Sequence, residues 1–238
     1  IAIEKFLAAR THFLVAIGNE VKQDLINAGI GSAAQYKVFF PGLPAPHTAG
    51  KAELRQKLGL DAAKIYCTFV GRLTQIKRPD RLLDIASAMQ ARGVAIEFLV
   101  AGEGELFAQS QTRAKSEQLA VTFLGWRKDI DELFAASDIA ILTSDNEGIP
   151  LTLIQAAQAG LPIIAPKVGS ISDIVENDVT GFLTSPAPGA MASALSALAT
   201  DEKLRIQLGS AGKKRASELF SLERMLRDHT EIYHLAHR

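Results

Sequence analysis

The chain contains 238 residues, 47% of them hydrophobic, and its 26 Lys and Arg balance its 26 Asp and Glu, so the formal net charge is +0. This length and composition indicate a globular protein with one large α/β domain, or one domain plus part of another. The balanced charge argues against nucleic acid or an anionic membrane surface as a partner, and no apolar run reaches the ~18 residues of a membrane span.

Short apolar runs alternate with amphipathic stretches along the chain. In chain order, the predicted strands are residues 12–18, 36–42, 64–71, 96–102, 121–125, 139–144, 161–166 and 181–184, the last with the weakest pattern. Helical patterns cover residues 78–91, 107–118, 129–136 and 150–159, and a last helix begins at residue 221. Several runs are continuously apolar, as strands covered on both faces should be. The alternation predicts a doubly wound, Rossmann-like parallel sheet, which binds ligands at the carboxyl ends of its strands.

Residues 41–50 are rich in Pro and Gly and lack periodicity, which predicts an interdomain linker. The elements before it are too few for a domain, and Ile1 is not an initiator Met. We therefore expect residues 1–42 to be the tail end of a largely missing N-terminal domain. Residues 43–220 would form a complete second domain, and residues 221–238 a helix that packs back toward the N-terminal part.

Cys67 is the single cysteine and lies inside the predicted strand 64–71. One cysteine excludes an internal disulfide framework, and its apolar neighbours predict a buried thiol. We expect the reducing cytoplasm as its compartment.

The loop after Val70 begins with Gly71 and Arg72 and carries Lys77 before the next helix. Glycine lets backbone approach a ligand, arginine grips phosphate oxygens as a fork, and lysine adds a point charge. These residues predict a polyphosphate site, and a solvated basic loop is the open alternative.

The loop after residues 96–100 contains Gly102, Glu103 and a second glycine, in the order that begins a dinucleotide fingerprint. Phe107 stands where the third glycine of that fingerprint belongs. The loop is either one wall of a nucleotide pocket or a simple turn, and the sequence leaves both readings open.

The stretch SDNEGIPLTLIQ, residues 144–155, follows the strand expected at 139–144. Pro150 suits the first position of a helix that ends before Gly160. The free amides of Gly148, Ile149 and Leu151, with the positive end of the helix dipole behind them, would then form an anion site.

Two polar side chains accompany this helix start. Glu147 either complements the helix dipole, as first-turn acids often do, or contacts a ligand at the strand end. Gln155 lies on the same helix face as Leu151, one turn deeper, where it would reach hydroxyl groups of a bound ligand.

Taken together and in this order, these loops resemble the retaining glycosyltransferases of the GT-B fold, in particular glycosyltransferase family 4. The matching segments are residues 69–83, 98–106, 121–126 and 137–183 and the closing helix. Residues 1–42 resemble the end of that fold's acceptor-binding domain, and residues 38–44 its interdomain crossing.

The resemblance implies catalytic roles for Arg72, Lys77 and Glu147. Arg72 and Lys77 would hold the diphosphate of the donor and neutralise its developing charge, so neither a metal nor another cofactor is required. The histidines at positions 47, 229, 234 and 237 lie in the linker or the terminal helix and suggest no metal site. Glu147 matches the first acid of the family's pair, which accepts hydrogen bonds from the donor sugar.

Gln155 stands at the family's second acid, whose carboxylate accepts from both ribose hydroxyls. An amide offers one acceptor oxygen, so the change should cost about 1 kcal/mol of nucleotide affinity. By the same resemblance, Gly125 and Trp126 approach the base together with residues 102–105. Asp173 replaces a glutamate that often stands in this segment.

The implied function is metal-independent transfer of a hexose-type sugar, with retained configuration, from a nucleoside diphosphate sugar to a glycan, lipid or small-molecule acceptor. Polysaccharide or glycolipid synthesis fits this activity, with peripheral membrane contact through the missing domain left open. A noncatalytic nucleotide-sugar-binding module and one half of a split enzyme remain alternatives. An epimerase or phosphorylase explains the ordered motifs less well, and Phe107 argues against a nicotinamide oxidoreductase.

Overall fold

The computed structural model describes residues 1–46 and 49–236, and side chains as far as residue 234. His47 and His237, two of the histidines considered above, lie outside the described residues, as does part of the expected linker. In chain order the elements are α1 (Ala2–Ala8), β1 (Leu14–Ala16), α2 (Asn19–Asn27), β2 (Tyr36–Val38), α3 (Lys51–Lys57), β3 (Tyr66–Val70), the 3-10 helix η1 (Gln75–Lys77), α4 (Pro79–Ala91), β4 (Glu97–Ala101), α5 (Phe107–Ser116), β5 (Val121–Gly125), α6 (Ile130–Ala136), β6 (Ile139–Ile141), α7 (Leu151–Gln158), β7 (Ile163–Pro166), α8 (Ile171–Ile174), β8 (Gly181–Thr184), α9 (Pro188–Thr200), α10 (Glu202–Leu219) and α11 (Leu222–Ala236).

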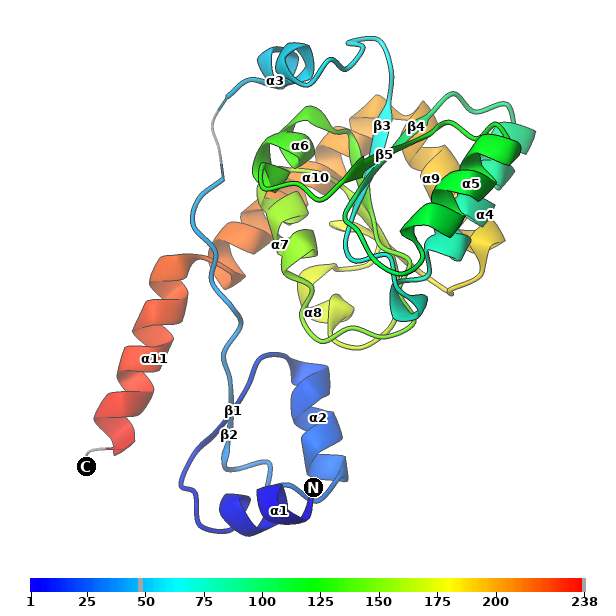
Figure 1. Ribbon diagram of the computed structural model, residues 1–238. Coiled ribbons are helices and arrows are strands. Elements are labelled where there is room, and N and C mark those ends of the chain that lie inside the picture. The colour runs from blue at the N-terminus through cyan, green and yellow to red at the C-terminus, as the bar shows by residue number, and fades with distance from the viewer. Residues whose placement is uncertain (47–48, 237–238) are drawn as a thin grey trace.

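The larger body is a six-stranded parallel sheet in the order β5-β4-β3-β6-β7-β8. Helices α4, α5 and α9 lie on one side of it and α6, α7 and α10 on the other (Figure 1). The central strands are mostly apolar, and Phe69 and Phe98 are 0% and 1% exposed in the core between sheet and helices. The doubly wound parallel sheet predicted from the apolar runs is confirmed.

The strand order reverses between β3 and β6. The chain runs outward from β3 through β4 to β5, then returns to place β6 on the other side of β3, where Cys67 pairs with Ile139. In sheets of this kind the crevice outside the carboxyl ends at the reversal is where ligands bind. The loops that leave β3 and β6 therefore begin at the expected ligand position.

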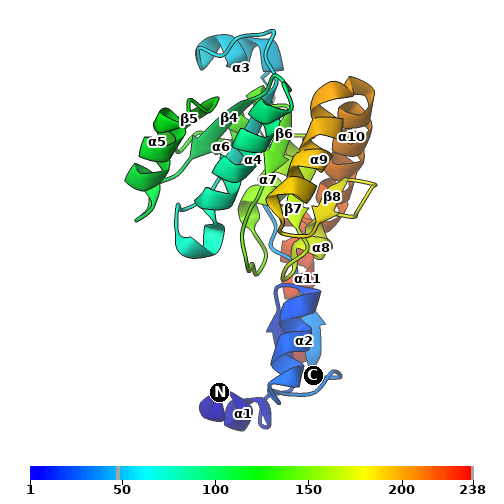
Figure 2. The ribbon, with the colours of Figure 1, turned by 90° about the vertical axis from the view of Figure 1, so that its right-hand side faces the viewer.

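A small unit of α1, β1, α2 and β2 lies apart from the large sheet, and α11 runs beside it (Figures 1 and 2). Arg224 Nη2 of α11 donates to the carbonyl oxygen of Phe40 over 2.8 Å. The amide of Leu43 donates to the carbonyl of Phe220 over 2.9 Å. The last helix thus packs along the segment that follows β2, while the three-part domain division remains a prediction.

Helix α2 touches the large body at α8. The backbone amide and the side-chain amide of Asn19 donate to the two carboxylate oxygens of Asp173, each over 2.7 Å. The side chain of Asp173 therefore caps a helix that belongs to the small unit. No described helix combines the length and apolar character needed to cross a bilayer.

Candidate functional site

Lys77 and Glu147 meet at the reversal of strand order. Lys77 ends η1, just after β3, and Glu147 lies in the loop after β6. Lys77 Nζ lies 2.5 Å from Glu147 Oε1, and Ser144 Oγ donates to the same oxygen over 2.6 Å. The two charged side chains are only 20% and 9% exposed. Oppositely charged groups from two crossovers are thus paired where a ligand is expected.

The helix after Glu147 begins one residue later than predicted. Pro150 has extended backbone angles, φ −73° and ψ 105°, and caps a helix whose first residue is Leu151. The amides of Gly148, Ile149 and Leu151 have no hydrogen-bond partner anywhere in residues 1–46 and 49–236. Three free donors and the positive end of α7 therefore lie next to the Lys77–Glu147 pair.

Arg72 is exposed, and its guanidinium makes neither an ion pair nor a hydrogen bond with any described residue. The other arginines near this edge are engaged. Arg78 pairs with Asp80 and Asp145, and Arg81 also pairs with Asp145. The hydrogen bond from Arg78 lowers the pKa of the Asp80 carboxyl. Arg72 is thus a cation still available to an anionic ligand.

Two glycines hold neighbouring loops in contact at this edge. A Cβ on Gly102, where φ is +136°, would lie 2.9 Å from the carbonyl carbon of Gly71 and overlap its oxygen. A Cβ on Gly169, where φ is +49°, would do the same to Glu147 at the same 2.9 Å. The loop after β4 therefore rests on the loop after β3, and the loop after β7 on the one that carries Glu147.

The residues expected near a nucleotide base lie together on the loops after β4 and β5. The amide of Gly102 donates to the carbonyl of Gly125 over 2.7 Å, which joins the two loops. Glu103 Oε1 lies 3.7 Å from where a Cβ of Gly125 would be. The side chain of Trp126 is 70% exposed, so a flat apolar surface is available beside them.

Gln155 does not stand alone on α7. Its Nε2 donates to Asp131 Oδ1 over 2.9 Å, and both residues are partly buried. Sequence reasoning did not identify Asp131 or Ser144 as site residues. Their positions were the available signal, because Asp131 lies in the first turn of the helix after the predicted strand 121–125, and Ser144 ends the predicted strand 139–144. The pattern could not show the direction of either side chain.

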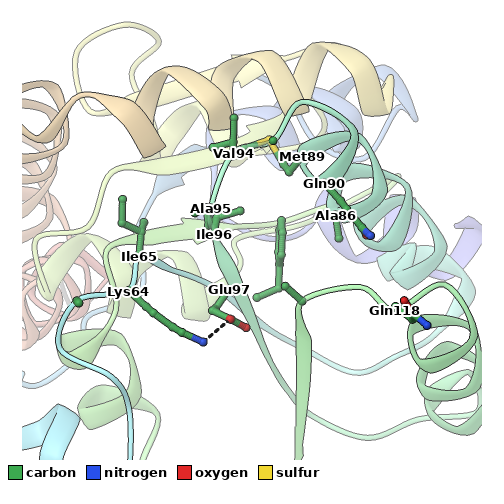
Figure 3. A pocket seen from close by; sticks show the side chains of 14 residues that line it. Lys64, Ile65, Ala86, Met89, Gln90, Val94, Ala95, Ile96, Glu97 and Gln118 are labelled. Atoms are coloured by element: carbon green, nitrogen blue, oxygen red, sulfur yellow. Dashed lines mark hydrogen bonds and ion pairs between the residues drawn. The ribbon is translucent and has the colours of Figure 1, made fainter.

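Two cavities among the described residues are lined by neither Lys77 nor Glu147. The larger, about 550 Å³, lies at the amino ends of β3 and β4 (Figure 3). Met89 and Val94 give it an apolar wall, and Lys64 pairs with Glu97 over 2.7 Å at its edge. Because ligands of doubly wound sheets bind at the carboxyl ends, we place the candidate site at the opposite edge.

The described residues contain no group of three or more His, Cys, Asp or Glu side chains able to hold a metal ion. The ring of His229 is engaged instead: Nδ1 lies 2.8 Å from the carbonyl oxygen of Met225. Of the cations predicted for this site, Lys77 pairs with Glu147, and Arg72 lies in the same loop after β3.

The chain matches a known family and several known proteins. The family model described as glycosyl transferases group 1 matches residues 50–215. The chain is 30% identical over 190 residues to the UDP-Gal:alpha-D-GlcNAc-diphosphoundecaprenol alpha-1,3-galactosyltransferase of Escherichia coli, covering 76% of this chain and 49% of that protein. It is 31% identical over 247 residues to a D-inositol 3-phosphate glycosyltransferase of Rhodococcus jostii, covering 98% of this chain and 54% of the relative.

Among solved structures, the complex of Anabaena Alr3699/HepE with UDP and glucose superposes with a TM-score of 0.87 at 25% identity. The match covers 98% of this chain and 66% of that one. The chain spans about half the length of the two curated relatives named above.

Proposed function

Because the chain belongs to the glycosyl transferases group 1 family, we propose that it binds a nucleoside diphosphate sugar and serves its transfer to an acceptor hydroxyl. The observation that carries this proposal is the Lys77–Glu147 pair beside the free amides of α7, at the reversal of strand order. A pyrophosphate is the ligand that matches these donors. It accepts hydrogen bonds from backbone amides at a helix start and from fixed cations.

Each site residue has a distinct part in the proposal. Arg72 and Lys77 bind the diphosphate together with the amides of Gly148 and Ile149. Only Oε1 of Glu147 has partners among the described side chains, so Oε2 is free to accept from a hydroxyl of the donor sugar. The base lies against Gly125 and Trp126.

In the proposed reaction, the bond between the anomeric carbon and the β-phosphate oxygen breaks as a bond to the acceptor oxygen forms on the same face. The departing phosphate oxygen takes the proton of the acceptor hydroxyl. This retaining course is that of glycosyltransferase family 4, to which we assign the chain. Arg72, Lys77 and the helix amides neutralise the charge that develops on the diphosphate, so the step needs no metal.

UDP is the first nucleotide to test. The Anabaena structures contain UDP or UDP-glucose, and the E. coli relative is named for transfer from UDP-Gal. That relative acts on a diphosphoundecaprenol-linked sugar by its name, which supports a glycolipid acceptor within polysaccharide or glycolipid synthesis. We further propose a cytoplasmic location, which suits the buried, unpaired Cys67.

Calorimetry with UDP, GDP and ADP tests the site. We expect one of them to bind, and Arg72→Ala to weaken binding by about tenfold to a hundredfold, since a hydrogen bond to a charged group contributes about 1.5–3 kcal/mol. Arg227→Ala, an exposed arginine on α11, is the matched control and should leave the affinity unchanged. Chelation by EDTA should also change nothing. Binding of none of the three at millimolar concentration would contradict the proposal.

A second candidate is a noncatalytic nucleotide-sugar-binding module or one half of a split enzyme. The amide of Gln155, where the resembling family has an acid, favours it. Transfer assays with UDP-sugars distinguish the two: nucleotide binding without sugar transfer to any acceptor supports the module. An inverted anomeric configuration of the product, measured by NMR, would contradict the retaining mechanism.

A further inference from the structure

Asp131 and Gln155 join the first turn of α6 to the second turn of α7. The hydrogen bond runs from Gln155 Nε2 to Asp131 Oδ1 over 2.9 Å. An ionised carboxylate only accepts hydrogen bonds, so the NH₂ group must face Asp131 and the carbonyl oxygen Oε1 must point elsewhere. The pair therefore fixes which way the amide of Gln155 is turned.

Asp131 has no other partner in the part of the chain that the structure describes. Its neighbours differ: Asp129 pairs with Arg127, and Glu132 pairs with Lys57. A partly buried carboxylate with a single amide donor has unused acceptor capacity, and removal from water makes further donors favourable. Asp131 Oδ2, part of the charged carboxylate, and the neutral Gln155 Oε1 are thus two acceptor oxygens without a partner among the described residues.

The position of the pair matches the middle of a nucleotide. Helix α6 follows β5, whose exit carries Gly125 and Trp126 on the proposed base side. Gln155 lies one turn along α7 from the free amides proposed to hold the diphosphate. Between the base and the diphosphate of a nucleotide lies its ribose, with two hydroxyl groups that both donate and accept.

Resting on the proposed function, we propose that Asp131 and Gln155 bind the donor ribose as a pair. The 2′-hydroxyl donates to Asp131 Oδ2 and the 3′-hydroxyl to Gln155 Oε1. Asp131 also positions Gln155 by holding its amide group. The negative charge at the ribose is then supplied from α6, rather than from the α7 position where the resembling family has its second acid.

If Asp131 supplies the charge at the ribose, replacing Gln155 with the family's glutamate should weaken nucleotide binding rather than strengthen it. Gln155→Glu places a second carboxylate within hydrogen-bond distance of Asp131, and like charges at that range repel. The single variant should therefore bind nucleotide more weakly than the wild-type chain at neutral pH. In the double variant Asp131→Asn/Gln155→Glu, the amide lies on α6 and the carboxylate on α7. One amide and one carboxylate are then present again, so binding should be restored.

The experiment measures dissociation constants for the tightest binder among UDP, GDP and ADP and for its 2′-deoxy form. The wild-type chain should prefer the ribonucleotide by about tenfold, the loss expected for one hydrogen bond to a charged group. Asp131→Asn should abolish most of this preference, and Asp131→Asn/Gln155→Glu should recover it to within about threefold, a coupling that only contacting residues show. Asp24→Asn, an exposed acid on α2, is the matched control.

The results distinguish failure of the ribose pair from failure of nucleotide binding itself. If the wild-type chain binds none of the three nucleotides, the proposed function fails and the ribose pair fails with it. If it binds one of them, loses affinity on Arg72→Ala and yet treats ribose and 2′-deoxyribose alike, the diphosphate site stands and the ribose pair is wrong. Tighter binding by Gln155→Glu alone would also overturn the pair.

Discussion

Gly169→Ala tests whether the loop after β7 sets the position of Glu147. Gly169 has φ +49°, and a Cβ there would lie 2.9 Å from the carbonyl carbon of Glu147 and overlap its oxygen. The left-handed conformation alone costs an alanine about 1–2 kcal/mol. Relieving the overlap requires a backbone shift, for which overpacking suggests about 1–3 kcal/mol more.

Gly93→Ala supplies the comparison that separates the two effects. Gly93 has φ +66°, so alanine there meets a similar conformational penalty, but nothing lies within 4 Å of its Cβ. Urea unfolding should therefore show Gly169→Ala to be less stable than Gly93→Ala by about 1–3 kcal/mol. Because the displaced Glu147 carries the first free amides with it, only Gly169→Ala should also weaken nucleotide binding.

Equal stability of the two variants, with equal nucleotide affinity, would refute this reasoning. It would mean that the loop gives way without cost and that Glu147 is not held by its neighbour. A loss of stability without loss of affinity would show that the contact supports the fold but not the site.

Three further changes probe other contacts. Glu147→Gln removes the negative charge that pairs with Lys77, so the free energy of unfolding in urea should fall by about 1 kcal/mol. UDP then meets a Lys77 without a competing carboxylate and should bind no more weakly. Weaker UDP binding would contradict the pairing. Asp173→Ala removes the cap of α2 at Asn19, so hydrogen exchange of the first α2 amides should become faster by the equivalent of about 1 kcal/mol. Unchanged exchange would contradict the contact. Burial raises the pKa of the Cys67 thiol, so this thiol should resist a thiol reagent until the chain is unfolded. The folded state should also lose stability as the pH rises past about 8.5, the pKa of an exposed thiol, because only the unfolded chain then ionises readily. Rapid labelling of the native chain would contradict its burial.

The elements of the large sheet were predictable because burial on both faces leaves a strong local signal. The run from Ile139 to Leu142 is apolar at every position and lies in or directly after β6, 2% exposed or less. Gly160 follows the last turn of α7, as its place after an amphipathic stretch indicated. Such patterns report whether a residue is buried along its own element, which fixes the fold class.

Helix α3 was not predicted, because its sequence directly follows the expected linker and its stability depends on distant partners. Arg55, only 7% exposed, reaches Asp138 from this helix over 2.6 Å. Pro150 was placed one residue too far into α7, since a proline suits both the cap and the first turn. Both features depend on how neighbouring segments meet rather than on local pattern.

In the candidate site, too, local pattern predicted the position of residues but not their contacts. Strand ends located Lys77 and Glu147 at one edge of the sheet, but the sequence did not indicate that they would pair with each other. Likewise, Gln155 was expected to face a ligand, whereas its partner Asp131 lies 24 positions away on another helix. Residue types and spacing thus predict where chemistry gathers, and packing decides which side chains touch.

A crystal structure of the chain with UDP tests most directly whether the loops after β3 and β6 converge on one diphosphate. The account predicts both phosphates within hydrogen-bond distance of Lys77, Arg72 and the amides of Gly148 and Ile149. A diphosphate bound at another edge of the sheet, such as the cavity beside Met89, or one that touches Arg72 but not the start of α7, would contradict it.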